Sequence, residues 1–120
     1  MRRSLLIISR QSPWSGPNAR EALDIVLAGG AFDLPIGLLF LDDGVFQLAA
    51  NQDARALQQK DLSANLQALP MFGVEDLFVC GDSATERGLD PKALSLEEAQ
   101  VLTVGEITAL IDRYHQVITL

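Results

Sequence analysis

Short apolar runs typical of β-strands alternate with helix-forming segments along the whole chain, and this alternation restricts the possible folds most strongly. The first run, residues 4–9, is apolar on both faces, as the central strand of a parallel sheet usually is. Because parallel strands need crossover connections, the alternation predicts an α/β fold with a parallel sheet and crossover helices. The expected strands occupy residues 4–9, 36–41, 74–80, 99–102 and 116–120.

Capping residues predict where the helices begin and end. Asn18 is expected to cap a helix that Gly29 and Gly30 stop. The spacing of a capping box predicts two further helix starts, at Ser83 and at Thr103. A leucine stripe that includes Leu62, Leu66 and Leu69 predicts another helix, which is expected to end before Pro70.

Length, charge and cysteine content limit the class of protein. A chain of 120 residues, 48% of them hydrophobic, is expected to form one compact domain over residues 1–120. A net charge of −7 argues against binding to nucleic acid, which requires clustered Lys and Arg. One cysteine excludes an intrachain disulfide, and no apolar run has the length of a signal peptide or membrane span. We therefore expect a cytoplasmic protein without membrane contact.

Cys80 is the leading candidate for chemistry, because it stands where a buried strand leaves the predicted sheet. Ligands and reactive groups gather at the carboxyl ends of strands in open α/β sheets. The start of a following helix favours the thiolate, whereas Asp82 and Glu86 place negative charge near the sulfur. A lone cysteine that ends a buried strand is, moreover, usually inert packing. Both interpretations stay open on these residues alone.

Three other features have a possible function and a simpler structural explanation. The loop over residues 9–18 is rich in serine and could hold an anion or a flavin, but it matches no phosphate-binding motif and is more typical of a turn-rich connection. Asp42 and Asp43 suggest a metal or phospho-acceptor site, but such a site needs further acidic residues after the first strand and a lysine near a late strand, which this chain lacks. Asp43 is therefore expected to cap a helix that carries Phe46. His115 has no second histidine for a metal site. We expect neither metal nor cofactor.

Exposed apolar side chains predict a contact surface for other proteins. A surface of this kind suits the positive mean hydropathy of the chain, since buried interface area raises the apolar content of a subunit. The residues expected to contribute are Trp14, Phe46, Met71 and Phe72.

Four motifs in order give the chain a family resemblance. They are Asn18-Ala-Arg-Glu-Ala-Leu-Asp24, Leu39-Phe-Leu-Asp-Asp-Gly-Val-Phe-Gln-Leu48, Glu86-Arg-Gly-Leu-Asp90 and a final Tyr114-x-x-Val-Ile118 strand. With these motifs the chain resembles the TusC-like, or DsrF-like, subunits of the DsrE/DsrF/DsrH sulfur-relay family over essentially its whole length. The resemblance implies a single-domain, three-layer α/β sandwich with a five-stranded, mainly parallel sheet and helices on both faces.

The resemblance also implies partners and a pathway. Subunits of this type assemble with TusB-like and TusD-like subunits into a heterohexamer. That complex relays persulfide sulfur from a TusA-like to a TusE-like carrier, for 2-thiouridine formation at the wobble position of certain tRNAs. The DsrF-like alternative places the subunit in dissimilatory sulfur oxidation.

The family assigns the sulfur-carrying cysteine to the TusD-like or DsrE-like subunit, eight residues before a glycine. Cys80 and Gly88 reproduce this spacing, so Cys80 maps onto the persulfide position and is the candidate sulfur carrier. The sister subunit, however, has small apolar residues where this chain has Gly81, Asp82 and Ser83. The resemblance therefore implies a scaffold subunit that is not itself catalytic, and a sulfurtransferase acting through Cys80 is the alternative.

Overall fold

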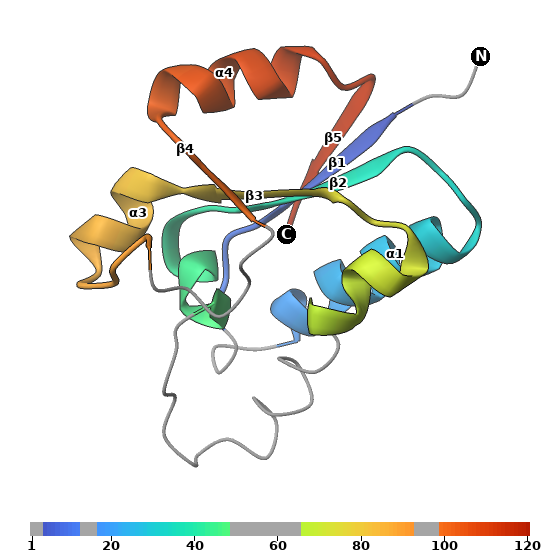
Figure 1. Ribbon diagram of the computed structural model, residues 1–120, viewed down its shortest axis with the longest axis horizontal. Coiled ribbons are helices and arrows are strands. Elements are labelled where there is room, and N and C mark those ends of the chain that lie inside the picture. Colours follow the sequence, from blue (N-terminus) through green and yellow to red (C-terminus); the bar gives the residue numbers. More distant parts are fainter. Residues whose placement is uncertain (1–3, 13–16, 49–65, 93–98) are drawn as a thin grey trace.

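A computed structural model of the chain describes residues 4–12, 17–48, 66–92 and 99–120 (Figure 1). Trp14 and Leu62 lie outside the described residues, so the predictions made for them are not tested. The elements in chain order are β1 (Leu5–Ser9), α1 (Asn18–Ala31), β2 (Ile36–Phe40), the 3-10 helices η1 (Asp42–Leu48) and η2 (Leu69–Phe72), β3 (Asp76–Cys80), α3 (Gly81–Glu86), β4 (Gln100–Leu102), α4 (Val104–Asp112) and β5 (Gln116–Thr119).

The strands form one five-stranded sheet in the order β4-β3-β2-β1-β5. Each neighbouring pair is parallel, so the predicted parallel sheet is confirmed. β1 is an interior strand, with Ile7 opposite Leu38 of β2 on one side and Ile118 of β5 on the other. The chain order reverses at β1, because β2, β3 and β4 lie on one side of it and β5 on the other.

Alternating side chains build a core on each face of the sheet. On one face, Ile7 and Leu38 belong to the same buried cluster as Val26 of α1. On the other face, Leu6 and Leu39 belong to a second cluster with Leu110 of α4. Figure 1 shows α1 and α4 on opposite sides of the sheet. The expected three-layer α/β architecture, with helices on both faces, is therefore confirmed.

The predicted boundaries of α1 are wrong at both ends. Pro17 takes the N-cap position, and no side chain caps the helix. Gly29 and Gly30 lie within the helix, which continues to Ala31. The reason is tertiary packing, because Gly29 is buried and a Cβ there would lie 2.9 Å from Cδ1 of Ile36. The absence of a side chain lets the last turn of α1 approach the sheet.

The other helix ends agree with the prediction in part. Thr103 caps α4 through the expected capping box, since its Oγ1 accepts a hydrogen bond from the Glu106 N–H at 3.2 Å and its own N–H donates to Glu106 Oε1 at 3.0 Å. Residues 66–68 are α-helical, so the expected end of this helix before Pro70 is confirmed, and the chain continues as η2 with Pro70 in its first turn. A proline fits there because the first turn needs no intrahelical N–H donor. Among the residues described, no helix has the length and apolarity of a membrane span.

Tyr114, the only tyrosine, lies half-buried against the α4-side core and makes stability depend on alkaline pH. Burial, reinforced by the negative charge of Asp76, raises the pKa of the Tyr114 phenol to about 12. An unfolded chain loses this proton near pH 10, about two units earlier. The contribution of the Tyr114 phenol to the free energy of unfolding is therefore fully present below about pH 10 and is lost as the pH rises toward about 12.

We expect the free energy of unfolding, measured in urea, to fall more steeply above about pH 10 for the wild-type chain than for the Tyr114→Phe chain. Every other titrating group is shared by the two chains, so the difference isolates the phenol. Parallel curves for the two chains would contradict the raised pKa.

Candidate functional site

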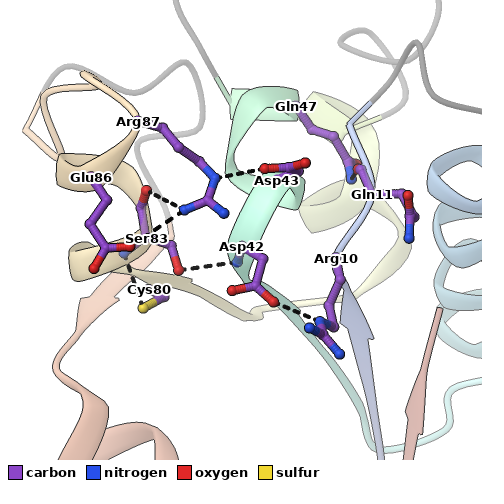
Figure 2. A network of polar contacts seen from close by, with 9 residues as sticks. All are labelled: Arg10, Gln11, Asp42, Asp43, Gln47, Cys80, Ser83, Glu86 and Arg87. Atoms are coloured by element: carbon purple, nitrogen blue, oxygen red, sulfur yellow. Dashed lines mark hydrogen bonds and ion pairs between the residues drawn. The ribbon is translucent and has the colours of Figure 1, made fainter.

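Polar side chains from four strands meet at the carboxyl edge of the sheet. Arg10 and Gln11 follow β1, Asp42 begins the segment after β2, Cys80 ends β3, and Thr119 ends β5. All of these strands are parallel, so their carboxyl ends lie at one edge. Figure 2 shows the polar network that the residues after β1, β2 and β3 form there.

Cys80 is the buried start of α3. The residue is only 3% exposed, and its side chain packs in the α4-side core with Leu39 and Phe78. Its Sγ accepts a hydrogen bond from the Ser83 N–H at 3.4 Å, so the thiol itself is the N-cap of the helix. The predicted capping box at Ser83 and Glu86 is therefore wrong, because α3 starts two residues before Ser83. The predicted helix stop agrees, since α3 ends just before Gly88, which has a φ of +76°.

Ser83 connects Cys80 to the segment after β2. Its N–H donates to the Cys80 sulfur, while its Oγ accepts from the backbone N–H of Asp42 at 3.1 Å. Asp42 has a positive φ of 52°, which is uncommon for a residue other than glycine. The bond from Asp42 to Ser83 thus joins the sharp turn after β2 to the first turn of α3.

Two ion pairs join the loops at this edge. The Nε of Arg10 lies 2.7 Å from Oδ2 of Asp42, and the Nε of Arg87 lies 2.8 Å from Oδ1 of Asp43. The hydrogen bond that Arg87 donates to Asp43 raises the pKa of Arg87 despite partial desolvation, so the guanidinium stays charged. The prediction that Asp43 caps a helix is wrong, since this side chain bonds Arg87 instead. Exposed pairs of this kind contribute at most about 1 kcal/mol each, so they position the loops more than they stabilise the fold.

Gln47, in the Asp-Asp-Gly-Val-Phe-Gln motif after β2, has a structural role. The side chain is buried, and its Nε2 donates to Ser9 Oγ at 2.7 Å and to the Gln11 carbonyl at 3.1 Å. It therefore holds the start of the loop after β1 against η1.

Phe46, expected to be exposed, is half-buried in the same helix. Met71 and Phe72 are exposed as predicted.

An open polar depression of about 550 Å³ lies beside these residues. It is lined by Arg10, Gln11, Asp42, Asp43, Arg87, Thr119 and Leu120. Its position between the ends of β1 and β5 is the point where the strand order reverses, which is the usual ligand position in open α/β sheets. Cys80 is not among the residues that line the depression, so the structure separates the thiol from this cavity.

The remaining predicted site residues lie elsewhere or are tied down locally. His115 stands at the opposite edge of the sheet, where its Nδ1 lies 3.0 Å from both the backbone nitrogen and the Oγ of Ser4. The imidazole thus helps to join the starts of β1 and β5. Of the loop over residues 9–18, positions 13–16 lie outside the described residues. Within the described parts of the chain, no group of three or more His, Cys, Asp or Glu side chains is placed to hold a metal ion.

The fold and this edge define a class, the three-layer α/β proteins with a cysteine at the carboxyl end of a strand. The crystal structure of the ychN protein from E. coli has this fold, with a TM-score of 0.75 over 100% of both chains. The identity is 15%, so this likeness concerns the fold alone. The chain belongs to the DsrE/DsrF-like family, whose model matches residues 3–120.

Relatives within the family confirm the resemblance seen in the motifs. The chain is 67% identical to a TusC homologue of Pseudomonas aeruginosa over 120 residues, which is the whole of both chains. It is 33% identical to the TusC protein of Klebsiella pneumoniae over 114 residues, covering 95% of each chain. It is also 38% identical over 87 residues to the intracellular sulfur oxidation protein DsrF of Allochromatium vinosum, covering 72% of this chain and 64% of that protein.

Proposed function

We propose that the chain is a TusC-like subunit of a cytoplasmic sulfur-relay complex, in which it acts as a scaffold and not as a sulfur carrier. The observation that carries the proposal is the 67% identity to a TusC homologue over the full length of both chains. The family implies assembly with TusB-like and TusD-like subunits into a heterohexamer. That complex would relay sulfur from a TusA-like to a TusE-like carrier, toward 2-thiouridine at the tRNA wobble position.

The surroundings of Cys80 support the scaffold role. To accept sulfur, the Cys80 thiolate would attack the outer sulfur of a donor persulfide, forming one S–S bond while the donor's S–S bond breaks and the donor leaves as a thiolate. That attack requires an accessible sulfur, whereas Cys80 is 3% exposed and its Sγ already accepts the Ser83 N–H. A structural cysteine that is buried among apolar groups is inert.

The complex is tested by co-expression of this chain with TusB-like and TusD-like proteins, followed by size-exclusion chromatography with light scattering. We expect one species with the mass of a hexamer of small subunits that contains this chain. A chain that elutes alone in the presence of both partners would overturn the proposal.

Replacing Cys80 by serine is expected to leave the assembly intact and tRNA thiolation within about twofold of wild type, because a serine Oγ accepts the same N-cap hydrogen bond. Thiolation is measured as 2-thiouridine in digested tRNA, in cells that carry the variant as their only copy. The same substitution of the sulfur-carrying cysteine in the TusD-like partner is the control, and we expect it to abolish the signal. Complete loss of thiolation in Cys80→Ser, with the complex still formed, would favour the alternative of an active sulfurtransferase. That alternative also predicts a stable added sulfur on this chain in the mass spectrum after treatment with a persulfide donor.

A DsrF-like role in sulfur oxidation is the second candidate function of this chain, because DsrF is among its relatives. The match to DsrF is weaker than the match to the Pseudomonas aeruginosa homologue in both identity and coverage. Deletion of the gene separates the candidates, since the tRNA role predicts loss of 2-thiouridine and the oxidation role predicts loss of sulfur oxidation with normal tRNA.

A further inference from the structure

Four exposed apolar side chains gather at the amino edge of the sheet, opposite the site described above. They surround the junction between the end of α1 and η2, which lie side by side in Figure 1. Met71 is 87% exposed and Phe32 is 78% exposed, values that are unusual for side chains of this size. We call this set the apolar patch; its members are Phe32, Leu34, Met71 and Phe72.

The backbone beneath the apolar patch is held firmly in place. The Leu34 N–H donates to the Gly29 carbonyl at 2.9 Å, which closes the end of α1. The Val74 N–H donates to the Leu69 carbonyl at 3.1 Å, and both of these residues are buried. The two segments touch directly, since a Cβ on Gly30 would lie 2.7 Å from the Phe72 carbonyl oxygen. The apolar side chains therefore project from a preorganised surface, which lowers the entropic cost of binding.

The charged residues within the two segments that form the junction are all acidic. Residues 29–36 and 68–77, which form the junction, carry Asp33, Glu75 and Asp76 and no Lys or Arg. A second copy of this chain, placed on the same surface, would bring like charges together. A partner with basic residues would instead meet complementary charge around an apolar centre.

We infer that the apolar patch is the docking surface for a different protein chain, one that presents apolar side chains surrounded by Lys or Arg. The inference rests on the proposed function and deepens it, because it assigns partner binding to the amino edge of the sheet. Docking there leaves the carboxyl edge, with Cys80 and the polar depression, outside the contact.

The test introduces positive charge into the apolar patch and at a matched site. Phe32→Lys and Met71→Lys should leave folding unchanged, because both side chains are largely exposed and the surrounding charges are acidic. Val104→Lys is the control, since Val104 is also exposed, at 58%, but lies at the start of α4. With TusB-like and TusD-like partners, we expect the patch variants to associate at least about tenfold more weakly and the control to assemble as wild type.

Glu75→Lys and Glu75→Gln test the charge rule. Reversal should weaken association more than neutralisation does, and added salt should reduce the difference between the two variants. Hydrogen exchange in the complex should slow over residues 29–36 and 68–77, and not over η1.

The outcomes separate the two proposals. If the wild-type chain does not assemble with these partners, both the proposed function and the docking surface are wrong. If it assembles and the patch variants do so equally well, or if the chain self-associates through the apolar patch, only the docking surface is wrong.

Discussion

Replacing Gly44 by alanine is expected to lower the free energy of unfolding by about 3 kcal/mol or more, at or above the upper end of what overpacking usually costs. Gly44 is buried in η1, and a Cβ there would overlap the carbonyl oxygen of Ser9. That oxygen belongs to the interior strand β1 and accepts the Leu41 N–H at 3.1 Å. Since the atoms in conflict are backbone atoms, no side-chain rotation relieves the overlap, and η1 must move away from β1.

Gly105→Ala is the matched control for this prediction. Gly105 lies in α4, and the nearest atom to a new Cβ there is Oγ1 of Thr103 at 4.0 Å. Alanine is the better helix former, so this substitution should raise the free energy of unfolding by up to about 1 kcal/mol. Urea unfolding followed by circular dichroism measures both variants. A Gly44→Ala chain as stable as wild type would contradict the close approach of η1 to β1.

The same displacement would reach the candidate site. Gln47 in η1 bonds Ser9 and Gln11, and Asp42 at the start of η1 pairs with Arg10. We therefore infer that the Asp-Asp-Gly-Val-Phe-Gln motif allows η1 to pack against the end of β1. Its glycine permits the approach, and its glutamine and first aspartate hold the loop after β1.

Local patterns predicted the strands of this fold because the apolar runs are short and well separated. Each observed strand lies within two residues of its expected boundaries. The start of α4 was also predictable from a local pattern, because Thr103 and Glu106 are three residues apart and form their capping box without contacts from the rest of the chain.

Tertiary contacts decided the boundaries that the sequence could not predict. Glycine ends many helices, but Gly29 instead lets α1 approach β2, and Gly30 lets it approach η2. Ser83 is a favoured N-cap residue, but Cys80 takes that position because β3 ends there and its sulfur meets the Ser83 N–H.

The candidate site was predictable only as a set of residues near strand ends. Its ion pairs join residues that are far apart in sequence, Arg10 with Asp42 and Arg87 with Asp43. Which strands are neighbours depends on the sheet order, which no local pattern determines. Arg87 belongs to the Glu86-Arg-Gly-Leu-Asp90 motif, but it reaches the polar depression only because α3 is folded against η1.

Replacing Gly37 by alanine is expected to lower the free energy of unfolding by a smaller amount, about 1–2 kcal/mol. Gly37 lies in β2, and a Cβ there would overlap the hydroxyl oxygen of Tyr114 and lie 3.0 Å from its Cζ. The Asp76 carbonyl oxygen, 3.3 Å away, closes the other side. Overpacking typically costs about 1–3 kcal/mol. Removing a glycine from a strand returns up to about 1 kcal/mol, which leaves the net loss given above.

Tyr114→Phe provides the means to test the origin of that loss, because it removes the overlapping oxygen and keeps the ring. In a double-mutant cycle, Gly37→Ala should cost at least about 1 kcal/mol less in the Tyr114→Phe chain than in the wild type. The rescue should be partial, since Cζ of the ring and the Asp76 carbonyl remain close to the new methyl group. If the two substitutions are instead additive within about 0.5 kcal/mol, the phenol does not lie over Gly37. The burial that raises the pKa of Tyr114 would then have to come from contacts other than the one with Gly37.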